Sequence, residues 1–173
     1  LGHLALSGDT KGSRSIAIGY GVLFNQNFTS ATDTYNTAVG HSAGTAVTTG
    51  IRNTLIGGLA GDALTDADYN VALGSSALSA DTLGSRAVAV GRNALINQNF
   101  TSATNNYNVA VGFSAGGQVT TGILNTLIGS LAGDALTSGD NNTAVGYLAL
   151  SADTLGDRNV AIGVSALGAQ NFT

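Results

Sequence analysis

A short motif of three or four apolar residues ending in glycine recurs along the whole chain, for example as "NTAVG" at residues 36–40 and "NVAVG" at 108–112. Successive motif glycines are 21, 17, 17, 17, 21, 17, 17 and 17 residues apart. Self-similarity at such a period is the sequence signature of a solenoid, in which each repeat buries its apolar face only against its neighbours. The nine motif glycines are Gly19, Gly40, Gly57, Gly74, Gly91, Gly112, Gly129, Gly146 and Gly163.

Four short repeats make one super-repeat of 72 residues, and residues 19–90 match residues 91–162 at 50 of 72 positions. Residues 1–18 and 163–173 align as partial copies, so we expect residues 1–173 to be one repeat array taken from a longer fibre. The polar segment "NQNFTSAT" occurs at 25–32 and again at 97–104, in the two longer intervals. It therefore enlarges a 17-residue coil to 21 residues.

The apolar part of each motif predicts a short β-strand. The position just before glycine is Val, Ile or Leu, the third position before it is Val, Ile or Thr, and Ala usually lies between them. Such β-branched residues favour strands, and a strand with two apolar faces is expected to be covered on both sides. One cover is the rest of the coil and the other is a partner chain. On this hypothesis, replacing Ala110 with Lys abolishes assembly.

Helices are a poor alternative, because apolar positions do not recur with helical spacing and every repeat contains glycine. The predicted fold class is all-β: a parallel β-solenoid of 17- and 21-residue coils that forms a homotrimer.

When the repeats are aligned, two further positions show recurring residue types. Asparagines four residues before the motif glycine predict a hydrogen-bonded ladder; they are Asn36, Asn53, Asn70, Asn108, Asn125, Asn142 and Asn159. The preceding residue alternates between Arg and Tyr from Arg14 to Tyr107, which favours stacking of guanidinium and phenol groups. We interpret this alternation mainly as a device that keeps the coils in register, with a carbohydrate or anion groove as the alternative.

The repeated pattern, as in Thr37-Ala38-Val39-Gly40 and Val109-Ala110-Val111-Gly112, resembles the head repeats of trimeric autotransporter adhesins, the YadA-like heads. Similar runs occur in bacteriophage tail fibres. The resemblance implies a left-handed parallel β-roll in which three chains pack their inner strands around one axis. The chain departs from that family in its longer coils and in showing neither a heptad stalk nor an anchor barrel.

The composition argues against catalysis. Only 9% of the residues are charged, cysteine is absent, and the two histidines, His3 and His41, occupy a variable position that we expect to face solvent. We therefore predict no enzymatic activity, no catalytic residue, no metal site and no cofactor. A formal charge of −4 argues against nucleic acid as partner, and no apolar stretch is long enough to cross a membrane.

Aspartates fall in turn-like segments, "GDALT" at Asp62 and Asp134 and "ADTLG" at Asp81 and Asp153, with "GDTKG" at Asp9. Their carboxylates are expected to accept hydrogen bonds from nearby backbone N–H groups, as in Asx turns. Stacked calcium ligands are the alternative.

Four N-glycosylation sequons are present: "NFT" at Asn27, Asn99 and Asn171, and "NNT" at Asn141. Glycosylation of a surface loop is one interpretation of them. The other is a polar excursion that satisfies its own backbone hydrogen bonds.

The function expected from these features is mechanical and adhesive: an extracellular, cell-surface fibre segment that displays loops to a host-surface or matrix receptor. The alternatives are a bacteriophage tail-fibre shaft on a virion, and a self-assembling surface filament in which the coils stack end to end as a polymer.

Overall fold

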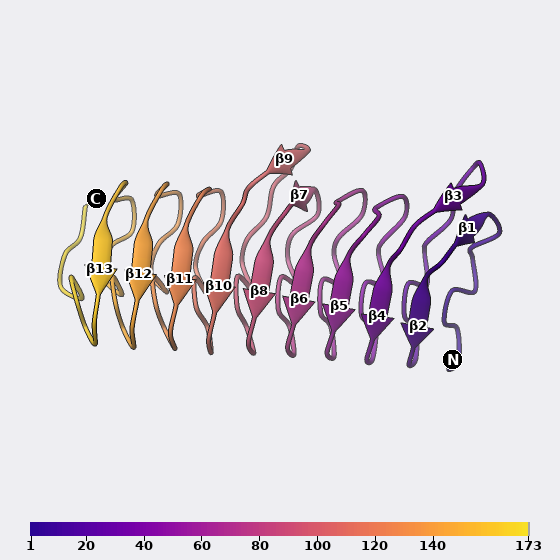
Figure 1. The fold of residues 1–173 in the computed structure, drawn as a ribbon, viewed down its shortest axis with the longest axis horizontal. Helices are drawn as coiled ribbons and strands as arrows, with labels where there is room; N and C mark the ends of the chain where they lie inside the picture. Colours follow the sequence, from indigo (N-terminus) through magenta and orange to yellow (C-terminus); the bar gives the residue numbers. More distant parts are fainter. Residues whose placement is uncertain (173) are drawn as a thin grey trace.

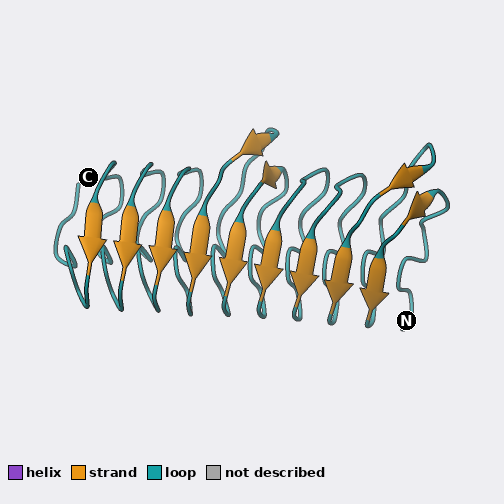
Figure 2. Ribbon diagram, viewed as in Figure 1, coloured by secondary structure: helices purple, strands orange, loops and turns teal. Residues whose placement is uncertain are grey.

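The computed structural model describes residues 1–172, which form one continuous stack of coils (Figure 1). Each coil contributes one three-residue strand to a nine-stranded parallel sheet running along the stack (Figure 2). The prediction of an all-β parallel solenoid is thereby confirmed. The strands are β2 (Ile16–Ile18), β4 (Thr37–Val39), β5 (Thr54–Ile56), β6 (Val71–Leu73), β8 (Val88–Val90), β10 (Val109–Val111), β11 (Thr126–Ile128), β12 (Thr143–Val145) and β13 (Val160–Ile162).

The strands pair in strict register, so that equivalent residues of consecutive coils lie side by side. Ala38 is opposite Leu55 across a 17-residue coil, and Ala89 is opposite Ala110 across a 21-residue coil. The four additional residues therefore leave the main sheet unchanged. None of the described residues is helical, and so residues 1–172 contain no helix able to cross a membrane.

The additional residues protrude from the body beside two small sheets (Figure 1). In the first, β1 (Gly12–Ser13) pairs in parallel with β3 (Thr32–Asp33). In the second, β7 (Gly84–Ser85) pairs with β9 (Thr104–Asn105). Each pair joins the lengthened coil to the coil before it.

The coil turns through a repeated set of positive φ angles. The motif glycines adopt φ between 121° and 141°, a region that side-chain-bearing residues rarely enter. An added Cβ at Gly57 would lie 2.5 Å from the carbonyl oxygen of Gly74, the motif glycine of the next coil. Glycine is thus required both by the backbone conformation and by the close approach of neighbouring coils.

The small residues of the strands face the inside of the coil. Ala38, Ala72 and Ala110 are fully buried, whereas the residues on either side of each are half-buried or exposed. The assumption behind the Ala110→Lys test is therefore wrong: the side chain of Ala110 lies in the core of its own coil, and the test would disrupt the coil rather than an interface.

Larger and smaller residues compensate for one another inside the stack. Leu55 occupies a strand position that is usually alanine. A Cβ added at Gly44 would lie only 2.6 Å from Leu55 Cδ1, and one added at Gly61 only 2.8 Å from Leu55 Cδ2. Leu127 has the same relation to Gly116 and Gly133. Since interiors are close-packed, the large strand residue and the missing side chains form one packing solution.

Candidate functional site

The asparagine ladder lies inside the solenoid and joins each coil in two directions. Asn53 Nδ2 donates across its own coil to the carbonyl oxygen of Ala67 at 2.7 Å, and its Oδ1 accepts the backbone N–H of Asn70 at 2.9 Å. Asn36, Asn108, Asn125 and Asn142 repeat this arrangement. Buried amides satisfied in this way hold both the coil closure and the register of the stack.

Asn159 lies near the end of the described chain, and its contacts differ from those of the other ladder asparagines. It is half-buried, and its Nδ2 donates to Asp153 Oδ2 at 3.0 Å. Gln170 Nε2 donates to Asn159 Oδ1 at 2.9 Å.

Each lengthened coil contains a buried polar layer. Gln98 Nε2 donates to Asp81 Oδ2 at 2.6 Å, and Gln98 Oε1 accepts from Asn108 Nδ2 at 2.8 Å. Asp81 Oδ1 also accepts the backbone N–H groups of Gly84 and Phe100, at 3.0 and 3.1 Å. The polar segment at 97–104 is therefore only partly a surface loop, because Gln98 and Phe100 point inward and help to close the core.

The same layer occurs in the first lengthened coil, where Gln26 bridges Asp9 and Asn36. A similar contact is present near the end of the described chain, where Gln170 approaches Asp153 at 3.3 Å. Asp9, Asp81 and Asp153 accept the N–H of the glycine three residues ahead, at 2.7, 3.0 and 2.9 Å. The predicted Asx-type turns are confirmed at these three residues.

Asp62 and Asp134 do not follow that pattern. The Oδ1 atom of each is buried without a hydrogen-bond partner. Desolvation by burial raises the pKa of both carboxyl groups, opposed by a hydrogen bond to the backbone of the same residue. Burial likewise raises the pKa of Asp81, against the lowering effect of its bonds to Gln98 and the backbone.

An exposed column, which we call the Arg–Tyr column, runs along the stack immediately before the ladder asparagines. The Cζ atom of Arg52 lies 6.0 Å from the ring centroid of Tyr35 and 5.3 Å from that of Tyr69. Arg86 lies 4.8 Å from Tyr69 and 5.8 Å from Tyr107. The column thus places guanidinium groups between tyrosine rings over six consecutive coils, from Arg14 to Tyr107.

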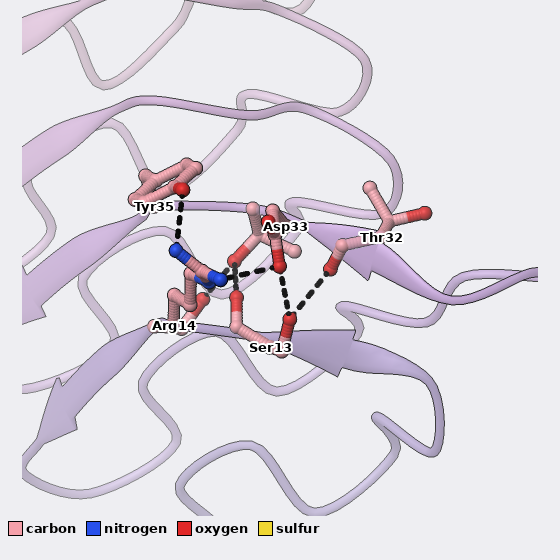
Figure 3. A network of polar contacts seen from close by, with 7 residues as sticks. Ser13, Arg14, Thr32, Asp33 and Tyr35 are labelled. Carbon is pink, nitrogen blue, oxygen red and sulfur yellow. Dashed lines mark hydrogen bonds and ion pairs between the residues drawn. The ribbon is translucent and has the colours of Figure 1, made fainter.

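Figure 3 shows the N-terminal end of the Arg–Tyr column. Arg14 Nη1 donates to the hydroxyl of Tyr35 at 2.8 Å, and Arg14 Nε pairs with Asp33 Oδ1 at 3.0 Å. Asp33 also accepts from Ser13 Oγ at 2.8 Å, which joins β1 to β3. All of these side chains are exposed to solvent.

A second exposed column follows the motif glycines and contains both histidines. Tyr20 stacks between His3 and His41, with ring centroids 5.6 and 5.4 Å apart. Farther along, Arg92 lies over Phe113 at 5.6 Å. The histidines face solvent, as their variable position predicts.

The sequon asparagines Asn27 and Asn99 are exposed on the lengthened coils, beside the protruding segments. Thr82 Oγ1 donates to Asn99 Oδ1 at 3.1 Å, and Thr10 Oγ1 to Asn27 Oδ1 at 3.4 Å. Asn171 has the same contact with Thr154 at 3.0 Å, although Thr173 of its sequon lies outside the described residues. Asn141 is exposed in the Arg–Tyr register with φ of 59°, one residue before the buried ladder asparagine Asn142.

The outward side of the nine-stranded sheet, which we call the outer face, is uncharged and largely apolar. It is formed by the first and third residues of each strand. Ile16, Ile18, Leu73 and Ile128 are 51%, 42%, 42% and 38% exposed. Apolar side chains form a continuous row at the third position of the strands, and an apolar surface of this kind is characteristic of an interaction site.

Over residues 1–172 the structure shows no ligand-sized pocket and no cluster of three or more His, Cys, Asp or Glu residues that could hold a metal ion. Comparisons with protein-family models, curated proteins and solved structures find no significant match to this chain. The candidate interaction surfaces of the described residues are the outer face and the two exposed columns.

Proposed function

We propose that this chain is a segment of an extracellular, adhesive fibre without enzymatic activity, in which three copies assemble through their outer faces. The observation that carries the proposal is the outer face itself: nine strands present two unbroken rows of Val, Ile, Leu and Thr to solvent. Covering them with a partner removes apolar surface from water, worth about 25 cal/mol per Å².

A second copy of the chain suits this surface better than an unrelated partner. The two rows repeat coil by coil along the whole stack, so parallel copies match at every level without a change of spacing. The outer face has no charged residue, so identical faces do not repel one another. Three copies also agree with the resemblance to trimeric adhesin heads, in which the winding is left-handed.

The mechanical part of the function follows from the stacking. Each coil contacts only its neighbours, so that length increases by adding repeats. The lengthened coils display their loops at intervals of four coils, about 19 Å at the usual strand spacing. This arrangement suits a fibre on a cell surface that presents loops to a host-surface or matrix receptor.

Native mass spectrometry of the parent chain and two lysine variants tests the assembly. The parent is expected at three times the 17.1 kDa of one chain, and Val111→Lys, on the outer face, is expected as a folded monomer. Thr101→Lys, on an exposed loop, adds the same charge and should remain trimeric. A folded monomer from the parent would refute the proposal, and masses that rise without limit would indicate a self-assembling filament.

A further inference from the structure

The Arg–Tyr column concentrates the few cationic groups of the chain. Four of the five arginines stand in its register: Arg14, Arg52, Arg86 and Arg158. The chain as a whole has a formal charge of −4. A local row of cations on an acidic molecule indicates attraction of an anionic partner at that row.

The stack does not need these residues. Leu124 and Asn141 occupy the positions equivalent to Arg52 and Tyr69, with φ of 60° and 59° against 58° and 60°. Their backbone N–H groups donate to the preceding coil at 2.8 and 3.0 Å, as those of Arg52 and Tyr69 do at 2.7 and 3.1 Å. Because the coil forms equally well with Leu and Asn, holding the register does not account for Arg and Tyr.

The guanidinium groups keep donors available to a ligand. Arg52 donates through Nη1 to the Tyr69 hydroxyl, and Arg86 through Nε to Asn105 Oδ1 at 3.1 Å. Each guanidinium has five N–H groups, and stacking on a ring leaves its edge free for a carboxylate or sulfate. Among the described residues only Arg14 forms an ion pair, with Asp33.

Of the column arginines Arg14, Arg52 and Arg86, only Arg14 is paired with a carboxylate. Asp33 compensates Arg14, whereas the equivalent position beside Arg86 is the neutral Asn105. The Asp68 carboxylate accepts the backbone N–H of Ile51 at 2.8 Å, and that of Asp66 accepts from Thr49 Oγ1 at 2.6 Å. Arg52 and Arg86 have no carboxylate of their own.

The spacing of the arginines indicates how far apart the negative charges of the anionic partner should be. They occur on alternate coils, about 9.6 Å apart at the usual strand spacing. An extended polysaccharide with one carboxylate on every second sugar ring repeats its charge at a comparable interval, and tyrosine hydroxyls lie between the cations to meet sugar hydroxyls. Phosphates of double-stranded DNA are much denser, about 3.4 Å apart on each strand, and demand a broad basic face.

We infer that the Arg–Tyr column binds an acidic polysaccharide that lies along the long axis of the fibre. The inference rests on the proposed adhesive function and names the class of ligand. Binding at this row is expected to weaken with salt, because the contacts are exposed and charge-assisted.

Two variants taken from the chain's own repeats test the inference, with hyaluronan fragments as the probe. Arg52→Leu combined with Tyr69→Asn installs the residues of the second super-repeat, and should weaken binding about tenfold or more through the loss of charge-assisted contacts. Leu124→Arg combined with Asn141→Tyr extends the column to Arg158 and should strengthen binding. Isothermal titration calorimetry at two salt concentrations gives the affinities.

The controls separate this inference from the proposed assembly. The free energy of unfolding of the Arg52→Leu/Tyr69→Asn variant should lie within ~1 kcal/mol of that of the parent, since exposed cation–π contacts contribute little to stability. Absence of hyaluronan binding by the parent, unchanged affinity of that variant, or equal binding of neutral dextran or single-stranded DNA overturns the inference. If the parent is a trimer that does not bind hyaluronan, only the polysaccharide inference is refuted. If a folded monomer binds hyaluronan, only the proposed trimeric assembly is refuted.

Discussion

The two super-repeats, residues 19–90 and 91–162, share their internal framework and differ mainly on the surface. Both have the same motif glycines and the same Asp–Gln layer at equivalent positions, and they share three ladder asparagines. Outward positions differ: Tyr20 corresponds to Arg92, Arg52 to Leu124 and Tyr69 to Asn141. The coil geometry therefore restricts the inside of the stack and leaves the outward columns free to acquire a binding function.

A few internal positions also differ, and their neighbours account for the difference. Ala87, beside the polar layer of Asp81, corresponds to Asn159, which donates to Asp153 at 3.0 Å. Asp81 and Asp153 otherwise have equivalent partners: each accepts a backbone N–H at 3.1 Å, from Phe100 or Phe172, and a glutamine amide, from Gln98 at 2.6 Å or Gln170 at 3.3 Å. The exchange of Ala87 for Asn159 therefore adds a donor to the layer and keeps its other contacts.

The largest expected effect comes from the motif glycines, which should be equally important in both super-repeats. Gly57→Ala and Gly129→Ala each combine positive φ with a Cβ within 2.5 Å of a backbone oxygen. Each should lower the free energy of unfolding by about 3 kcal/mol or more. Urea unfolding followed by circular dichroism provides the measurement.

Gly58→Ala is the matched control, because a Cβ at Gly58 has no neighbour within 4 Å and the equivalent residue is Ser130. It should change stability by less than ~0.5 kcal/mol. A large loss for only one of Gly57→Ala and Gly129→Ala would contradict the idea of a common framework.

The buried asparagines should give the next largest effect. Asn53→Ala leaves the N–H of Asn70 and the carbonyl of Ala67 without their partners, and Asn125→Ala does the same to Asn142 and Gly139. Unsatisfied buried groups cost about 1–3 kcal/mol each, so both variants should lose ~2–4 kcal/mol.

Thermal unfolding monitored by circular dichroism compares the two asparagine variants with Asn25→Ala, whose side chain is exposed. The control should unfold close to the parent. If Asn53→Ala did so as well, the ladder would not be what holds the coils together.

The sequence alone sufficed for the coil boundaries, the strand positions, the asparagine ladder and the Arg–Tyr stacking, because each depends on a residue type recurring at a fixed offset. Which side of the strand faced inward could not be inferred, since Ala38 and Val39 are both apolar. The sequence also did not indicate that the side chains of Gln26 and Phe28 point into the core. Their segment is polar overall, and only contacts across coils, to Asp9 and Asn36, draw it into the core.

The smallest expected effect is a pH dependence shared by the super-repeats. Burial raises the pKa of Asp62 and Asp134 in the fold, so their contribution to stability is fully present below the unfolded carboxyl pKa and is lost as pH rises through the folded value. Lowering the pH from neutral into the acidic range should therefore favour the folded state at these two sites.

Asp62→Asn and Asp134→Asn remove the titrating groups and should weaken the pH dependence of stability by similar amounts. Urea titrations between neutral pH and the carboxyl range measure the slope for each variant. A steeper rise of stability toward acid in either variant than in the parent would contradict the stated sign.

The central claim, that parallel copies meet in register at the outer face, is tested most directly by the distance between identical positions in the assembly. The chain has no cysteine, so Ser130→Cys, next to β11, and Thr101→Cys, on a protruding loop, can each carry one nitroxide label. Pulsed electron–electron dipolar spectroscopy should give a single, short separation at residue 130 and a longer one at residue 101. No dipolar coupling at residue 130, or a shorter separation at residue 101, would contradict the account.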